Sequence, residues 1–280
     1  MVKHRHYSIP SQHQATRKHV MRFGDLEVEK HGHVAVVEIQ RPPNNFFDTE
    51  LIISMCDAFE AMDEDTDVRA LVLLSQGKHF CAGANFGNRE EQGKRENRTE
   101  SGGNPLYSAA VRLFGCKKPV IGAIQGAAVG GGFGLAVMPD FRVVCPQARF
   151  TANFVKLGFH PGFGLTYTLP KLIGQQKANL MFMSGRRING ETAYEWGLAD
   201  VLTDQENLRD EAMKLAEEIA ENAPLAVLSV RATMREGIAE AVKAQTDHEF
   251  IEQHRLQQTE DHKEGLRAVA ERRPGNFKGR

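Results

Sequence analysis

The sequence predicts an α/β fold whose C-terminal third is helical, and two patterns support this prediction. Short apolar runs with strand character alternate with helical spacing in the first half of the chain; they are VAVVEI (34–39), ALVLLS (70–75) and PVIGAI (119–124). From residue 163 onward the spacing of apolar residues is helical throughout. With 280 residues the chain can form one large domain, or one domain plus an appendage.

Turn and breaker residues delimit the N-terminal elements. The two prolines of RPPNNFFD prevent a helix from starting before that segment ends, and Thr49 can cap the helix that follows. One face of this helix is apolar: Leu51, Ile52, Met55, Phe59 and Met62. A polar turn at 63–67 then leads to ALVLLS, whose uniform apolarity fits a strand buried on both faces.

The later elements follow the same logic. A glycine-bearing loop at 77–86 precedes a polar segment at 88–104, which we expect to be a mobile loop or lid. A helix is expected at 106–113, and strands at 141–145 and 148–154. Six helical segments follow: 163–172, 176–184, 190–196, 205–222, 224–237 and 240–262.

Composition excludes several classes of partner. The chain has 35 basic and 36 acidic residues, so no global charge favours nucleic acid or an anionic membrane surface. It contains no apolar stretch long enough to span a membrane. The cysteines at 56, 81, 116 and 145 lack metal-binding spacing, which predicts free thiols, no metal site and a cytoplasmic location.

Residues 1–24 differ from the rest because they are basic, rich in histidine and free of acidic residues. A transit peptide has a similar composition, but we favour a flexible N-terminal arm. There is no hydrophobic signal core, so secretion is not expected.

Common cofactor and nucleophile motifs are absent. GGFGLA lacks the third glycine of the dinucleotide pattern, and the phosphate-loop, nucleophile-elbow and HExxH signatures do not occur. Two loops of small residues remain, AGA (82–84) and VGGG (129–132), each after a buried strand. Their N–H groups can converge as an oxyanion hole, or the glycines can simply permit tight packing. The residues alone do not decide between these two interpretations.

Three segments together resemble the crotonase (enoyl-CoA hydratase/isomerase) superfamily: FCAGANF, KPVIGAIQGAAVGGGFGLAVMPD and GRRINGETAYEWGLAD. The terminal NFKG is also similar. The resemblance implies a crotonase (ClpP-like) spiral of ββα repeats over 25–205, which binds acyl-CoA. It also implies a helical trimerisation region at 206–280, a homotrimer or a hexamer built as a dimer of trimers, and no cofactor other than the coenzyme A of the substrate. In such a site the N–H groups of Ala84 and Gly131 hold the thioester oxygen as it becomes an enolate.

The chain departs from the hydratases of this family at both acid/base positions. Gly134 stands where they carry the glutamate of GGGxE, and Phe154 stands where they carry the glutamate of a Pro-Glu pair. Hydration needs a base for the water and an acid for C2, which neither residue provides. We therefore expect an isomerase-, hydrolase- or lyase-like reaction. A catalytically idle acyl-CoA-binding paralogue, and a hydratase that uses other residues, are the alternatives.

Other residues are candidates for the missing proton carrier. His160 lies in a loop where several family members place a catalytic acid, although it can also be an ordinary loop histidine. Glu90 and Glu91 can reach the site from the predicted lid, or remain solvated there. Asn85 replaces the usual aspartate after AGA and is expected to keep a structural hydrogen bond.

The resemblance also implies the substrate-binding residues. They come from the loop PPNNFF, the two small-residue loops, the two replaced glutamate positions and the C-terminus, where a lysine meets the coenzyme phosphates of a neighbouring subunit. They are Asn45, Phe46, Ala82, Gly83, Gly132, Gly134, Phe154 and Lys278.

Overall fold

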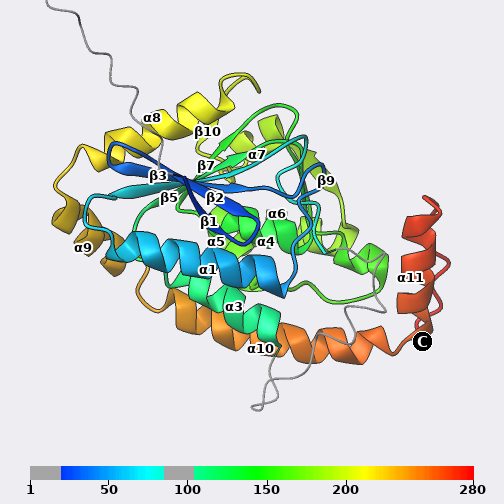
Figure 1. Ribbon diagram of the computed structural model, residues 1–280. Coiled ribbons are helices and arrows are strands. Elements are labelled where there is room, and N and C mark those ends of the chain that lie inside the picture. Colours follow the sequence, from blue (N-terminus) through cyan, green and yellow to red (C-terminus); the bar gives the residue numbers. More distant parts are fainter. Residues whose placement is uncertain (1–19, 85–103) are drawn as a thin grey trace, which may run out of the picture.

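The computed structural model describes residues 20–84 and 104–280, and it has the predicted α/β architecture (Figure 1). The larger sheet has the order β1-β2-β3-β4-β5-β7-β10. Its strands are β1 (Val20–Phe23), β2 (Leu26–His31), β3 (Val34–Ile39), β4 (Ala70–Ser75), β5 (Val120–Ile124), β7 (Phe141–Val144) and β10 (Val201–Leu202). The first three strands pair antiparallel, and the others continue the sheet in parallel from β3.

A second, smaller sheet has three strands. Its order is β6 (Ala127–Val129), β8 (Arg149–Thr151) and β9 (Arg187–Asn189). The helices that surround the two sheets are α1 (Thr49–Glu64), α3 (Pro105–Phe114), α4 (Gly131–Val137), η2 (3₁₀, Asn153–Leu157), α5 (Leu165–Ile173), α6 (Gln175–Ser184), α7 (Gly190–Glu195), α8 (Leu208–Ala220), α9 (Pro224–Met234), α10 (Ile238–Gln257) and α11 (Glu260–Ala270).

The larger sheet is buried on both faces, and β4 shows this residue by residue. Val72 and Leu74 pack with α8 on one face, whereas Leu71 and Leu73 belong to the main core on the other. Figure 1 shows α8 on one side of the sheet and α1, α3 and α10 on the opposite side. The uniform apolarity of this strand therefore has the predicted cause, burial on both faces.

Several predicted boundaries were wrong for local reasons. Asp48, not Thr49, caps α1, because its side chain accepts a hydrogen bond from the N–H of Leu51 at 2.8 Å. The segment 148–154 is a strand only as far as Thr151 and then becomes the helix η2.

The C-terminal helices also differ from their predicted limits. The segment 240–262 is divided between α10 and α11, since the hydroxyl of Thr259 accepts from the N–H of His262 and starts a new helix. The hairpin of β1 and β2 was not foreseen, and β1 lies inside the stretch predicted as a flexible arm. Residues 1–19 of that arm lie outside the described residues.

The prediction of free thiols is confirmed in the described part of the chain. All four cysteines are free and buried. No described helix combines the length and apolarity that crossing a bilayer requires.

Candidate active site

The two loops of small residues lie side by side, joined by backbone hydrogen bonds. The N–H of Cys81 donates to the carbonyl of Ala127 at 2.9 Å, and the N–H of Val129 donates back to Cys81 at 3.0 Å. Gly83 has a φ of +91°, and a Cβ there would lie 2.8 Å from the carbonyl oxygen of Val129. Only glycine permits both this backbone angle and the close contact with the Val129 carbonyl. The glycine of AGA therefore allows the two loops to lie this close together.

This pairing brings Ala84 and Gly131 to the wall of one cavity of about 510 Å³. Gly131 is the first residue of α4, where helix geometry provides no intrahelical acceptor for its N–H. Neither its N–H nor that of Ala84 donates to a carbonyl of another described residue. Two backbone donors are therefore available on the cavity wall, which is what an oxyanion hole requires.

The cavity is lined mainly by apolar side chains. Phe154 is 6% exposed and packs edge-to-face on Phe159, with ring centroids 5.5 Å apart. Phenylalanines dominate the lining: Phe46, Phe47, Phe154, Phe159, Phe163 and Phe250. Among the described residues that line it, Tyr107 is the only one with a titratable side chain. Such a wall suits an apolar acyl chain, and its described residues offer no carboxylate to activate water.

Close packing explains the glycines of the second loop. A Cβ at Gly131 would collide with the ring of Phe47, and one at Gly132 would collide with the carbonyl of Cys81. Burial raises the pKa of the Cys81 thiol to about 12, so this cysteine packs as an apolar group and is not a thiolate nucleophile.

Gly134 does not line the cavity, because Phe163 covers it. A Cβ at Gly134 would lie 2.7 Å from both Cβ and Cδ1 of Phe163. Phe163 is 1% exposed, has a φ of +63°, and packs edge-to-face on Phe47 with ring centroids 5.9 Å apart. An aromatic ring thus occupies the space into which a side chain at position 134 would extend.

This arrangement predicts strong coupling between positions 134 and 163. Gly134→Ala should lower the free energy of unfolding by roughly 1–3 kcal/mol, because the added methyl group overpacks the ring of Phe163. In a Phe163→Gly background the same substitution should cost little, and Gly also suits the positive φ. Urea unfolding of the four variants measures the coupling. An equal cost in both backgrounds would show that Phe163 does not exclude side chains at 134.

The structure brings some of the residues predicted from the sequence together and leaves others apart. Ala84, Gly131, Phe46, Ala82, Gly83 and Phe154 all line the cavity. Gly132 and Gly134 lie behind its wall. Asn45 is fully buried, and its amide donates to the carbonyls of Gln76 and His79, so it fixes a turn. Lys278 lies in the exposed C-terminal tail, where its ammonium donates to Asn276.

His160 is not among the residues that line the cavity. Its Nδ1 lies 2.9 Å from the carbonyl oxygen of Pro161, and its ring packs against that of His248 with centroids 6.0 Å apart. This placement is that of a loop histidine, the alternative that the sequence left open. Asn85, Glu90 and Glu91 lie outside the described residues.

Sequence reasoning missed Glu249, which supports the cavity wall from outside. This fully buried residue of α10 accepts from the N–H groups of Gly164 (2.8 Å) and Thr166 (3.1 Å) and from the hydroxyl of Thr166. It therefore caps the start of α5, directly after Phe163. Burial raises the pKa of Glu249 to about 7, although the three donors oppose this shift.

Comparisons with known proteins point to one family. A family model described as enoyl-CoA hydratase/isomerase matches residues 29–280. The carnitinyl-CoA dehydratase of Proteus mirabilis is 33% identical over 260 residues, which cover 91% of this chain and 98% of the relative.

Solved structures share the fold. An enoyl-CoA hydratase/isomerase from Pseudoalteromonas atlantica matches with a TM-score of 0.80 at 27% identity, over 91% of this chain and 100% of the other. An enoyl-CoA hydratase from Bacillus anthracis matches with a TM-score of 0.69 at 29% identity, over the same shares of the two chains. The chain therefore belongs to the enoyl-CoA hydratase/isomerase (crotonase) family of acyl-CoA-processing enzymes.

Proposed function

We propose that this enzyme binds an acyl-CoA with its thioester oxygen between the N–H groups of Ala84 and Gly131, and stabilises the enolate that forms there. The observation that supports this most is a pair of backbone donors on one cavity wall that have no acceptor among the described residues. One such donor typically contributes about 3 kcal/mol to transition-state stabilisation. The coenzyme is part of the substrate, and no further cofactor is proposed.

The lining favours reactions in which a proton moves on carbon over reactions that need activated water. Hydrolysis and hydration both require a general base beside the water. The described lining has no Asp, Glu, His or Lys side chain. We therefore place isomerase- or lyase-type chemistry ahead of hydrolysis. The dehydratase name of the Proteus mirabilis relative instead supports the alternative of a hydratase or dehydratase that uses other residues, because loss of water is the reverse of hydration and needs the same acid and base.

A panel of acyl-CoAs tests the proposal, with product formation followed by mass spectrometry and binding followed by calorimetry. We expect turnover of at least one thioester with an apolar acyl chain. Binding without turnover across the panel would instead support a catalytically idle acyl-CoA-binding protein, which the absence of a carboxylate from the described lining also favours. Absence of binding would contradict both functions.

We predict that crotonyl-CoA is hydrated at less than a tenth of the rate of a family hydratase with both glutamates. The reason is that Gly134 and Phe154 replace those residues and Phe163 covers position 134. Loss of absorbance of the conjugated thioester measures the rate. A rate within tenfold of that hydratase would mean that other residues activate the water.

We also predict a homotrimer or homohexamer, as the family resemblance implies. In α9 the large apolar side chains of Leu225, Val230 and Met234 are 80%, 64% and 77% exposed in the isolated chain. Such an uncovered helix face suits a subunit interface. Light scattering should give three or six times the chain mass of 31.2 kDa. A monomer at micromolar concentration would contradict this assembly.

The cytoplasm is the proposed location. Four free, buried cysteines support a reducing compartment.

A further inference from the structure

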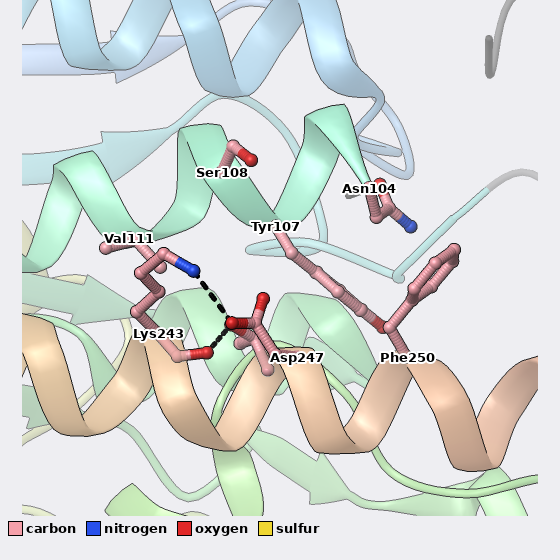
Figure 2. A pocket seen from close by; sticks show the side chains of 8 residues that line it. Asn104, Tyr107, Ser108, Val111, Lys243, Asp247 and Phe250 are labelled. Atoms are coloured by element: carbon pink, nitrogen blue, oxygen red, sulfur yellow. Dashed lines mark hydrogen bonds and ion pairs between the residues drawn. The ribbon is translucent and has the colours of Figure 1, made fainter. Parts of the chain in front are cut away.

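Tyr107 connects α3 to α10 at the wall of the active-site cavity. Figure 2 shows its side chain extending from α3 toward α10, with Phe250 beside it. The two rings pack edge-to-face, with centroids 6.4 Å apart. Tyr107 is only 9% exposed, and no other described lining residue has a titratable side chain.

The hydroxyl group of Tyr107 is held in a defined position. It donates to Oε1 of Gln253 at 2.7 Å. The amide of Gln253 is oriented by its other end, because Nε2 donates to the carbonyl of His160 at 2.9 Å. Gln253 therefore presents an oxygen to the phenol, which orients the hydroxyl.

The hydroxyl lies on the side of the large cavity. Tyr107 also borders a smaller cavity of about 130 Å³ between α3 and α10, which Figure 2 shows. However, Gln253 and Gly162, which both contact the hydroxyl, line only the large cavity. A Cβ at Gly162 would collide with that oxygen, so glycine at 162 makes room for the phenol.

Contacts link this hydroxyl to the position of the missing carboxylate. Phe163 packs directly on Gly134, and its preceding neighbour Gly162 contacts the Tyr107 hydroxyl. The phenol thus reaches the same stretch of cavity wall from the opposite element, α3. The Tyr107 hydroxyl is thus a proton donor on the wall of the cavity that Ala84 and Gly131 also line, whereas Gly134 lies behind that wall.

We propose that Tyr107 is the proton donor to C2 of the thioester enolate, an assignment that rests on the function proposed above. The hydroxyl rotates from Gln253 toward the substrate. Its O–H bond breaks as a C2–H bond forms from the electron pair of the enolate, and the oxyanion returns to a carbonyl. Water then reprotonates the phenolate. Gln253 is a positioning residue in this step.

Deuterium exchange at C2 tests the assignment, since the reverse of the step removes a C2 proton. The probe is 3-hexenoyl-CoA in D₂O, with exchange and double-bond migration followed by NMR. Tyr107→Phe keeps the ring packing on Phe250 and removes only the hydroxyl. We expect it to lower the exchange rate about a hundredfold or more, with affinity for hexanoyl-CoA within twofold of wild type. Tyr194→Phe, at a surface residue of α7 that is 49% exposed, is the matched control and should leave both unchanged.

The outcomes are separable. Exchange by Tyr107→Phe within threefold of wild type would overturn the assignment, and so would a loss of affinity with an unchanged rate at saturation. Absence of exchange in the wild-type protein would overturn the proposed function itself and this step with it. If Tyr107→Phe does not fold, 3,5-difluorotyrosine at position 107 preserves the contacts and acidifies the phenol. The pH profile of exchange should then move to lower pH, and an unmoved profile would overturn the assignment.

Discussion

Gly131→Pro is expected to lower kcat/KM toward the best acyl-CoA of the panel by ~10²–10³, because proline removes the N–H that meets the developing oxyanion. Proline is compatible with the first position of a helix, which is where Gly131 stands at the start of α4. The change therefore removes the donor without breaking the helix.

Gly131→Ala is the matched control for this prediction. Its Cβ meets the ring of Phe47 as the proline Cβ does, but alanine keeps the N–H. The ratio of the two variants thus separates the hydrogen bond from the steric cost, provided that circular dichroism shows both to be folded. Equal activity of the two variants would show that the N–H of Gly131 has no catalytic role.

Glu249→Ala is expected to destabilise the protein by roughly 3 kcal/mol, because it leaves the buried N–H of Gly164 and the part-buried N–H and hydroxyl of Thr166 without their acceptor at the start of α5. Glu249→Gln retains an amide oxygen and should cost less. Chemical denaturation at pH 7 compares the two variants. An alanine variant as stable as wild type would show that this cap does not support the loop of Phe163.

The same residue predicts a pH dependence of stability. The pKa of Glu249 is raised from 4.5 in the unfolded chain to about 7 in the folded protein. The folded state therefore binds more protons between these values, and this contribution to stability is full below pH 4.5 and is lost as pH rises through 7. It amounts to roughly 3 kcal/mol at most. Glu249→Gln should make the unfolding free energy less dependent on pH over this range. If the dependence on pH is the same in this variant as in wild type, groups other than Glu249 cause it.

The sequence predicted the parts of this fold that depend on local pattern. The strand ALVLLS is apolar at every position because both faces of β4 are buried, and the helices after residue 163 have regular spacing. The hairpin of β1 and β2 was missed. The alternation of polar and apolar residues in LEVEKH is too short to be a clear strand signal. In addition, β1 lies in the basic segment 1–24, whose composition suggested a flexible arm.

The candidate site was predictable where backbone geometry determines the residue type. Gly83 is glycine because a positive φ and a close carbonyl require it, and the AGA and GGG patterns express such constraints directly. The reason for Gly134 was not readable, since Phe163 lies 29 positions along the chain. Tyr107, Gln253 and Glu249 were missed for the same reason: their partners come from distant elements, and no local spacing records such contacts.

The polarisation of a thioester carbonyl by backbone N–H groups in this cavity can be measured without knowledge of the natural reaction. The probe is hexanoyl-CoA with a ¹³C-labelled thioester carbonyl, whose stretching frequency is read by difference infrared spectroscopy when it is bound to the protein. Two N–H donors should shift the stretch to lower frequency, and Gly131→Pro should reduce the shift. A bound thioester whose carbonyl frequency equals that of the free thioester in an apolar solvent would contradict the oxyanion hole of Ala84 and Gly131.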